Sequence, residues 1–341
     1  MADFVWFIYC VHHFSGMSRL IQTLLLFLFL FLTWRYFFTY RSLMICEDAQ
    51  RLASSVEVEY VMQTNRTNYC VGDEAAECVP PIFQYRQNYR VASKYHLAGC
   101  VIEKNFSTML TAILCYLFDE ARFTEHNRNI TAEVYHKRFC KAQNEHDSLA
   151  SLRSELNVDL KGWSLIAVVR DPLERFVSGY ANKCLRERVW KKFPDRCHGC
   201  KTNLTCFMER QYMRMKRWAR STHFIASFDD NHFFPQNWRC EFSSHLHDYQ
   251  ILKFDTFNPQ GFIDRLLAIF KKHKVSEKSI NFIRTSVTSR RTAHSTKDSV
   301  EQRETKNAIL SSKHLTNILI KMYFYDFVLF GFPIPEATYD E

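Results

Sequence analysis

Glycine is scarce in this 341-residue chain, which contains eight glycines and eight prolines. None of the glycines forms a G-x-G-x-x-G or G-x-x-x-x-G-K-[ST] pattern, so the sequence excludes the usual dinucleotide fingerprint and the standard phosphate-binding loop. A D-x-D metal motif is also absent, and Asp229-Asp230 is only a neighbouring pair. Any nucleotide site must therefore be built from other residues.

Apolar and basic residues are plentiful. Hydrophobic residues make up 47% of the chain and aromatic residues 15%, which indicates a globular protein rather than a disordered one. The formal net charge of +9 attracts anions over a long range. Nucleic acid, acidic lipid, phosphorylated cofactors and acidic glycans are all candidate partners on charge alone.

One long apolar run lies near the amino terminus, at residues 20–34, and continues past Arg35 to Phe38. About 20 apolar residues span a bilayer, so this run predicts a signal anchor that leaves the following chain in a lumen. A cleaved signal peptide is the alternative, but no small-x-small cleavage motif follows the run. The predicted parts are a cytoplasmic tail at 1–19, a membrane span at 20–40, a stem at 41–92 and a lumenal catalytic domain at 93–335.

The cysteines and the glycosylation sequons support an oxidising lumen. Eleven of the twelve cysteines follow the apolar run, so at least one is unpaired, and Cys100 and Cys115 are the candidates because they lie in apolar segments. Cys197-His-Gly-Cys200 leaves a zinc site open as an alternative. The cysteines expected to form disulfides are Cys184, Cys197, Cys200, Cys206 and Cys240. The sequons are at Asn65, Asn105, Asn129 and Asn203.

Apolar runs alternate with helical patterns along the second part of the chain. This alternation predicts a three-layer α/β fold with a central parallel sheet. Strands are expected at 97–102, 163–169 and 249–254. Helices are expected at 109–118, 172–188, 259–272, 276–287 and 304–325.

Two predicted strands end in cationic turns that lead into helices. The first turn carries Lys104, Ser107 and Thr108, and the second carries Arg170, with Arg175 and Ser178 three residues apart in the helix that follows. Ligands of parallel α/β sheets bind beyond the carboxyl ends of the strands, where helix amino termini favour anions. Ordinary helix capping explains each turn taken alone, but together they suggest a site for a ligand with two phosphates.

The segment VVRDPLERFVSGY, which contains the second turn, resembles the 3′-phosphate-binding motif of Golgi carbohydrate sulfotransferases of the chondroitin and HNK-1 type. The segment from Cys100 to Ile113 looks like the 5′-phosphosulfate loop of a nematode-type branch, with Glu103 and Phe106 where the commoner loop has Pro and Gly. The resemblance covers about residues 95–330. It implies a P-loop-like sulfotransferase fold, a Golgi location as a single-pass type II membrane protein, and 3′-phosphoadenosine 5′-phosphosulfate (PAPS) as sulfuryl donor, with no metal.

The resemblance also implies roles for individual residues. Lys104, Ser107 and Thr108 would hold the 5′-phosphosulfate, and Arg170 and Ser178 the 3′-phosphate. Asn105 belongs to this predicted cofactor site, and its sequon is expected to stay unused because a glycan there would block the cofactor. Arg175 and Arg290 are further candidates for the phosphates.

Catalysis also needs a base that accepts the proton of the acceptor hydroxyl. His232 is the first choice, and His294 and Glu120 are the alternatives. The basic stretch 210–220, with Tyr212 and Trp218 interleaved, would suit an acidic glycan or proteoglycan acceptor, while a lumenal location excludes nucleic acid. A solvated helix face explains this stretch nearly as well.

Three other functions remain open at this point. A metal-independent Golgi glycosyltransferase shares the anchor, the stem and the sequons. A non-catalytic glycan-binding membrane protein would use the basic surface alone. A sulfotransferase with a weakened cofactor loop, caused by Glu103 and Phe106, is the third.

Overall fold

The computed structural model of the protein describes residues 30–36, 69–70, 72–81, 85, 87–134, 137–220, 225–255, 258–289 and 299–336. The chain divides into two units, residues 1–59 and 60–341, and the fold is that of the second. In the first unit residues 30–36 are helical, and the rest of the expected span 20–40 lies outside the described residues. Within the described ranges, no helix combines the length and the apolar character needed to cross a bilayer.

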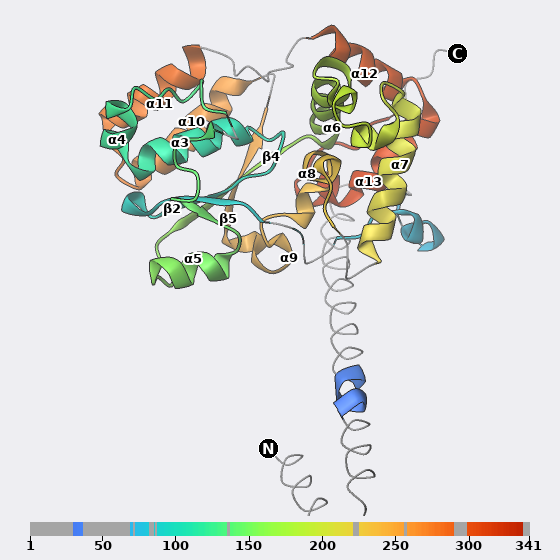
Figure 1. Cartoon of the computed structure of the whole chain (residues 1–341), viewed down its shortest axis with the longest axis horizontal. Helices are drawn as coiled ribbons and strands as arrows, with labels where there is room; N and C mark the ends of the chain where they lie inside the picture. The colour runs from blue at the N-terminus through green and yellow to red at the C-terminus, as the bar shows by residue number, and fades with distance from the viewer. Residues whose placement is uncertain are drawn as a thin grey trace, which may run out of the picture. The chain divides into compact units, whose positions relative to one another are not determined.

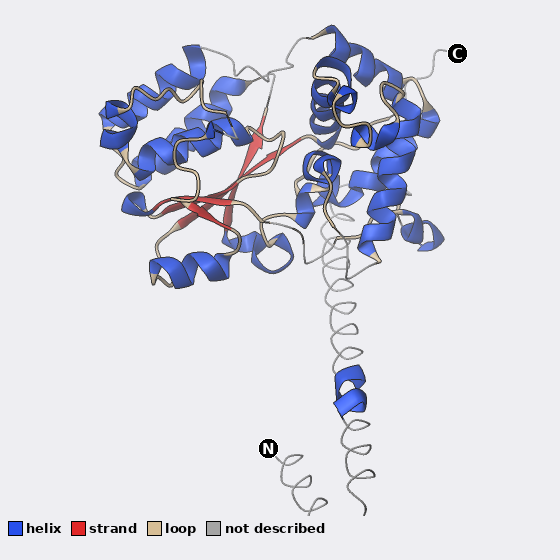
Figure 2. Ribbon diagram, in the orientation of Figure 1, coloured by secondary structure: helices blue, strands red, loops and turns tan. Residues whose placement is uncertain are grey.

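Five strands form one mixed sheet in the order β3-β1-β2-β4-β5. Figure 2 shows the strands in red, with helices around them. The strands β2 (Leu97–Cys100), β4 (Ser164–Arg170) and β5 (Tyr249–Phe254) are parallel, which confirms the three predicted strands. All seven residues of β4 are buried, as its unbroken apolar run requires. Two short antiparallel strands, β1 (Tyr89–Ala92) and β3 (Glu145–His146), extend one edge of the sheet and were not predicted.

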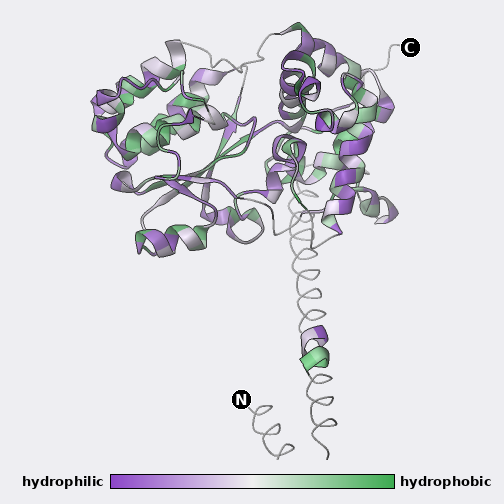
Figure 3. Cartoon of the chain, in the orientation of Figure 1, coloured by the Kyte–Doolittle hydropathy of each residue, from purple (hydrophilic) through white to green (hydrophobic). Residues whose placement is uncertain are grey.

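Helices cover both faces of the sheet (Figure 1). One face packs against α3 (Ser107–Phe118), α10 (Pro259–Lys272) and α11 (Glu277–Ser289). The other face packs against α5 (Leu149–Leu156) and α9 (Phe242–His245). Nine of the 12 residues of α3 are buried, and Figure 3 shows this helix as largely hydrophobic. The sheet with its helices is therefore a three-layer α/β arrangement.

A second core, made of helices alone, packs beside the sheet and was not predicted. It joins α6 (Pro172–Tyr180), α7 (Leu204–Ala219), α8 (Phe228–Phe233), α12 (Val300–Leu310) and α13 (Lys313–Leu329). Large aromatic side chains fill it, among them Phe176, Phe207 and Phe233. The remaining helical segments are Gly72–Glu77, Ser93–Tyr95, α4 (Glu120–Glu125), Ala181–Arg186, Val189–Lys191, Arg196–Gly199, Gln236–Trp238 and Leu246–Asp248.

Two predicted helices differ from the observed ones in ways that matter for the site. The helix expected at 172–188 is α-helical only to Tyr180 and continues as a π-helical turn at Ala181–Arg186. The helix expected at 304–325 is two helices, because Ser312 interrupts it and caps α13 by accepting a hydrogen bond from the Leu315 N–H at 3.3 Å. Apolar periodicity alone does not reveal either break.

Ten cysteines of the second unit form five disulfides, which corrects two predictions. Cys100 and Cys115 are not free thiols, because tertiary folding brings each beside a partner distant in sequence. Cys197 and Cys200 belong to different bridges, which overturns the zinc alternative. No group of three or more potential metal ligands occurs among the described residues. The bridges are Cys70–Cys78, Cys100–Cys240, Cys115–Cys140, Cys184–Cys197 and Cys200–Cys206.

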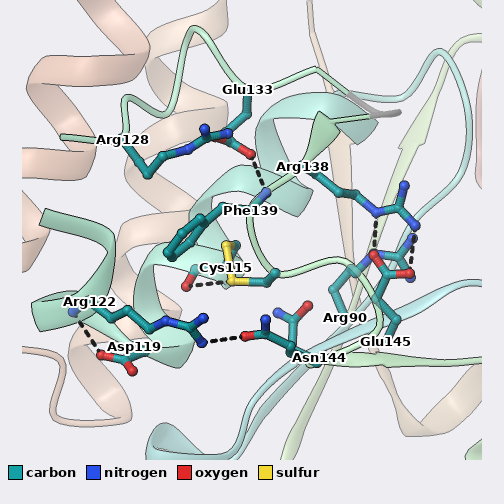
Figure 4. Close-up of a disulfide and its surroundings, with 12 residues drawn as sticks. Arg90, Cys115, Asp119, Arg122, Arg128, Glu133, Arg138, Phe139, Asn144 and Glu145 are labelled. Atoms are coloured by element: carbon teal, nitrogen blue, oxygen red, sulfur yellow. Dashed lines mark hydrogen bonds and ion pairs between the residues drawn. A yellow bond between two sulfur atoms is a disulfide. The ribbon is translucent and has the colours of Figure 1, made fainter. Parts of the chain in front are cut away.

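The Cys115–Cys140 bridge fixes the segment before β3 to the end of α3 (Figure 4). Cys140 Sγ also contacts the Cys115 carbonyl oxygen at 3.4 Å. Beside the bridge, Glu145 pairs with Arg138 and lies 3.4 Å from Arg90 Nε. Because Arg90 is only 2% exposed, this shared carboxylate is needed to balance its buried charge.

Candidate active site

The first cationic turn follows β2 and leads directly into α3. Residues 103–106 form the turn, and Lys104 and Phe106 have left-handed backbone conformations with φ of 71° and 62°. Phe106 precedes the helix and provides no side-chain cap. The N–H groups of Ser107 and Thr108 therefore have no partner inside the helix. Such a helix terminus favours a phosphate or sulfate group.

The second turn follows β4, which ends at Arg170. Asp171 caps α6 by accepting a hydrogen bond from the Glu174 N–H at 2.9 Å, and Pro172 occupies the first helical turn, as predicted. Arg170 is 5% exposed, and burial lowers its pKa to about 10, so it stays cationic at neutral pH. Its Nε is buried and has no hydrogen-bond partner among the described residues, which leaves a donor for a ligand.

The fold brings the two turns into contact. Strands β2 and β4 are parallel neighbours, so their carboxyl ends lie at the same edge of the sheet. Arg170 Nη1 donates to the backbone oxygen of Lys104 at 3.3 Å. Arg175 Nε donates to the backbone oxygen of Glu103 at 3.2 Å. The two turns predicted from sequence therefore form a single cationic site.

Arg175 lies beneath this site rather than at its surface. It is 1% exposed, and its Nη1 donates to the Phe234 carbonyl oxygen at 2.9 Å. Burial lowers the pKa of its guanidinium group, and Nη2 is buried without a hydrogen-bond partner in the described part of the chain. Ser178, on the same face of α6, is 7% exposed. Arg175 thus supports the first turn and still has one N–H for a ligand.

A buried amide that the sequence reasoning missed connects both turns. Gln236, which is 0% exposed, accepts a hydrogen bond from the Arg170 N–H at 2.9 Å and donates from Nε2 to the Arg170 carbonyl oxygen at 2.8 Å. Its Oε1 also accepts from Asn105 Nδ2. Its backbone N–H donates to Asp326 of α13 at 2.8 Å. One glutamine therefore joins the first turn, the end of β4 and the helical core.

The buried side chain of Asn105 stabilises the first turn by hydrogen bonds. Its side chain is 1% exposed, and Nδ2 donates to the Val168 carbonyl oxygen at 2.9 Å as well as to Gln236. A glycan on this buried nitrogen is incompatible with the packing, in line with the expectation that its sequon is unused. These two hydrogen bonds fix the turn to β4 and so help to fix the backbone of the neighbouring Lys104.

Lys104 lies at the centre of the site. Its Nζ donates to Asn182 Oδ1 at 2.9 Å, and Asn182 Nδ2 donates to Glu187 at 2.9 Å. Lys183 Nζ donates to the other oxygen of Glu187 at 2.7 Å. Desolvation lowers the pKa of Lys104 to about 7, with further contributions from Lys183 and Arg170. A bound anion raises that pKa and stabilises the ammonium form.

His232 belongs to the same electrostatic environment. Burial lowers its pKa well below the usual value, and the positive charges of Lys104 and Lys183 lower it further. Nδ1 contacts the Phe228 carbonyl oxygen at 2.8 Å, and because a carbonyl only accepts, Nδ1 carries the proton. Nε2 of the neutral ring then has a free lone pair for a proton. This is the form that a general base requires.

The two departures from the commoner loop are accommodated by this chain. Arg239 Nη2 lies 3.2 Å from Glu103 Oε2, so the acidic side chain is neutralised. Phe106 packs its ring against Phe254 and Phe262, with centroid distances of 5.6 and 5.0 Å. The Glu103 carboxylate is therefore balanced by a cation, and the Phe106 ring packs against the hydrophobic core.

The other predicted residues lie elsewhere. Arg290 and His294 are outside the described residues. Glu120 accepts hydrogen bonds from Lys94 at 2.8 Å and Tyr95 at 2.9 Å, residues that precede β2, whereas Lys104 follows it. Glu120 therefore lies at the opposite end of that strand and is removed from the site.

The basic stretch 210–220 in α7 is mostly engaged within the protein. Arg214 forms an ion pair with Asp230 at 2.5 Å. Tyr212 donates a hydrogen bond to Glu77, and Trp218 is 8% exposed and packs in the helical core. Trp218 is a packing residue, which corrects the suggestion that it stacks on sugars, and the role of Tyr212 stays a prediction.

Sequence reasoning missed Gln236, Asn182 and Lys183. The π-helical turn at Ala181–Arg186 changes the phase of the helix, so a regular helical projection does not predict which side chains meet Lys104. Gln236 follows the aromatic run His232-Phe-Phe-Pro235. A polar residue within an apolar segment was the available signal that it is buried and hydrogen-bonded.

Comparison with known proteins identifies the family of the chain. A model of the sulfotransferase family matches residues 87–333. The chain is 31% identical to the uncharacterized protein C18B2.2 of Caenorhabditis elegans over 83% of this chain and 79% of that protein. It is 34% identical to carbohydrate sulfotransferase chst-1 of the same organism over 74% of this chain and 78% of that protein. No solved structure matches. The predicted family is confirmed, and the chain belongs to the sulfotransferase family.

Proposed function

We propose that this protein is a carbohydrate sulfotransferase that moves the sulfuryl group of PAPS to a hydroxyl group of a glycan. Family membership gives the reaction class, and the likeness to a protein named carbohydrate sulfotransferase supports a sugar acceptor. The observation that carries the proposal is the contact between the two cationic turns, through Arg170 Nη1 and the Lys104 carbonyl oxygen at 3.3 Å. One nucleotide with phosphates at both ends fits such a paired site.

The residues present suit a doubly charged nucleotide. Two buried guanidinium nitrogens, Arg170 Nε and Arg175 Nη2, have no hydrogen-bond partner among the described residues. Buried donors are normally paired, so both are candidates to bind an anion. The uncapped start of α3 at Ser107 and Thr108 adds backbone donors. We infer that the α3 turn holds the 5′-phosphosulfate, and that Arg170, Arg175 and Ser178 hold the 3′-phosphate.

Two side chains have the properties that sulfuryl transfer needs. PAPS supplies an activated sulfuryl group, whose transfer leaves adenosine 3′,5′-bisphosphate. Lys104 places a positive charge at the phosphosulfate turn, where negative charge develops on the leaving oxygen. His232, neutral and with Nε2 free, accepts the proton of the attacking hydroxyl group. Its Nδ1 bond to Phe228 fixes the ring for this role.

We further propose a Golgi location, with a single membrane anchor at residues 20–40 and an acidic glycan or proteoglycan as acceptor. The apolar run at 20–34 and the net charge of +9 support these assignments. Five disulfides are typical of a protein that folds in an oxidising compartment.

Replacing Arg170 by alanine tests the proposal. Adenosine 3′,5′-bisphosphate is titrated calorimetrically into wild type, Arg170→Ala and Arg153→Ala, a control that removes an exposed positive charge from α5. We expect Arg170→Ala to lose at least about 100-fold in affinity, because a buried charge-assisted contact is removed, while both variants are secreted normally. Normal affinity in Arg170→Ala would refute the assignment.

The acceptor is identified by sulfate transfer. Wild type is incubated with radiolabelled PAPS and a panel of chondroitin, dermatan, heparan and N-glycan acceptors. A glycosyltransferase or a glycan-binding protein would transfer no sulfate and would not bind the bisphosphate. Absence of both activities in folded wild type would overturn the proposed function.

A further inference from the structure

Two cations flank one aromatic ring next to the catalytic candidates. The Arg196 guanidinium carbon lies 4.0 Å from the centre of the Phe228 ring, and Lys183 Nζ lies 5.8 Å from the same centre. Each cation is the chain neighbour of one cysteine of the Cys184–Cys197 bridge. The disulfide therefore fixes the π-helical turn to the segment Arg196–Gly199 and keeps the two cations together.

The same ring adjoins the candidate base. Phe228 begins α8, and His232 follows one helical turn later, with the two ring centres 4.6 Å apart. The His232 Nδ1 bond to the Phe228 carbonyl oxygen adds a second contact. Lys183 is also linked to Lys104 by hydrogen bonds through Glu187 and Asn182, and its positive charge lowers the pKa of both Lys104 and His232. A group held by Lys183 and Arg196 would thus lie beside the attacking hydroxyl.

The Arg196 guanidinium group packs against aromatic rings and not against acidic side chains of the described residues. Its guanidinium carbon lies 3.8 Å from the centre of the Phe193 ring, so it contacts two rings at once. Within the described ranges its guanidinium forms no ion pair, whereas Lys183 is paired with Glu187. Lys183, Glu187 and Arg196 together carry a net charge of +1. A guanidinium group already held in place binds a planar anion with little further loss of entropy.

We propose that Arg196, with Lys183 and the Phe228 ring, forms an acceptor subsite for an anionic group of the glycan, either a carboxylate or a sulfate. This inference rests on the proposed sulfotransferase function and makes the subsite selective for acidic sugars. An arginine fork suits both anions, since each presents two oxygens to parallel N–H donors. In the basic stretch of α7, Arg214 is paired with Asp230, and Arg210 and Lys216 donate to the carbonyl oxygens of His198 and Ala76, so these three cations are already engaged.

The test compares Arg196→Ala with Arg196→Lys and the matched control Arg153→Ala. Sulfate transfer is measured with the best acceptor of the panel, and with the same glycan after carboxyl reduction or after desulfation. We expect Arg196→Ala to raise the KM for the acidic acceptor about 10- to 100-fold, as loss of a charge-assisted contact predicts, with Arg196→Lys intermediate. Arg153→Ala should match wild type.

The altered acceptors identify the anion. If the subsite binds a carboxylate, carboxyl reduction removes the difference between Arg196→Ala and wild type, and if it binds a sulfate, desulfation does so. A neutral glycan as best acceptor, or an unchanged KM in Arg196→Ala, would overturn the subsite. Affinity for adenosine 3′,5′-bisphosphate should stay unchanged in Arg196→Ala, because the proposed subsite binds the acceptor and not the nucleotide. Loss of nucleotide affinity in that variant would also count against the subsite. Failure of wild type to bind that nucleotide or to transfer sulfate would instead reject the proposed function.

Discussion

Replacing Gln236 by methionine should separate the two halves of the nucleotide site. Methionine has a similar length but cannot accept the Arg170 N–H or donate to the Arg170 carbonyl oxygen, bonds of 2.9 and 2.8 Å in the structure. It also removes the acceptor of Asn105 Nδ2. The turn that holds Lys104 and the strand end that holds Arg170 would then lose their common anchor.

The size of the effect follows from the groups that lose a partner. Each buried polar group left unsatisfied costs about 1–3 kcal/mol. For the two backbone groups of Arg170 this gives about 2–6 kcal/mol. A domain of this size loses about 2–4 °C of Tm per kcal/mol, so we expect Tm to fall by about 4–24 °C. Asn105 keeps its bond to Val168 and should contribute less.

The functional measurement compares two ligands. Under the proposed assignment, adenosine 3′,5′-bisphosphate would engage both turns, whereas adenosine 5′-monophosphate would engage only the first. The measured quantity is the ratio of the affinity for the bisphosphate to the affinity for the monophosphate. If Gln236 sets the spacing of the turns, Gln236→Met should lower this ratio about tenfold, which corresponds to about 1.4 kcal/mol. A smaller fraction of folded protein would lower the apparent affinity for both nucleotides equally and leave the ratio of affinities unchanged.

Gln211→Met is the matched control. Gln211 is also 0% exposed and accepts a hydrogen bond from His198 at 2.7 Å, but it lies on α7, away from both turns. This variant should lose stability and keep the wild-type ratio of affinities. An unchanged ratio in Gln236→Met, or an equal loss in both variants, would refute the role of Gln236.

Three further predictions concern the pH dependence set by Lys104 and by His232, and one disulfide. Burial lowers the Lys104 pKa to about 7, and the proposed mechanism uses its ammonium form. We therefore expect kcat/KM to fall as pH rises above about 7, and Lys104→Arg to move this decline to higher pH. Because the pKa of His232 is lowered well below its usual value, the base should stay unprotonated as pH falls from neutral, so a loss of rate that begins at neutral pH on acidification would contradict its assignment. The Cys100–Cys240 bridge closes a loop with a sequence separation of 140, so serine at both positions should cost about 5 kcal/mol and lower Tm by about 10–20 °C. Thermal denaturation with no loss of Tm would contradict that estimate.

Much of the α/β framework was predictable from local sequence. The buried strand ending at Arg170 was recognised because parallel central strands are continuous apolar runs, and Asp171-Pro172 is a helix start that needs no tertiary information. The helix Pro259–Lys272 was predicted with its observed bounds. The family was predicted for a similar reason, since the arginine motif is contiguous in the chain. The membrane span and the Golgi location stay predictions.

Pairings between distant segments were decided by the tertiary structure alone. Cys100 and Cys115 lie in apolar segments, but an apolar environment suits a disulfide as well as a thiol, and their partners Cys240 and Cys140 could not be inferred locally. The bond between Lys104 and Asn182 depends on a π-helical turn that side-chain periodicity does not reveal.

By itself, the sequence determined the two cationic turns, because strand, turn and helix follow from neighbouring residues. Only the folded chain determined that Gln236 connects them and that Arg196 and Lys183 meet over Phe228. These contacts join residues that lie between 32 and 131 positions apart along the chain. The Cys184–Cys197 bridge holds Lys183 and Arg196 together. Their geometry is set by how the sheet and the helical core pack together, and local propensity carries no information about that packing.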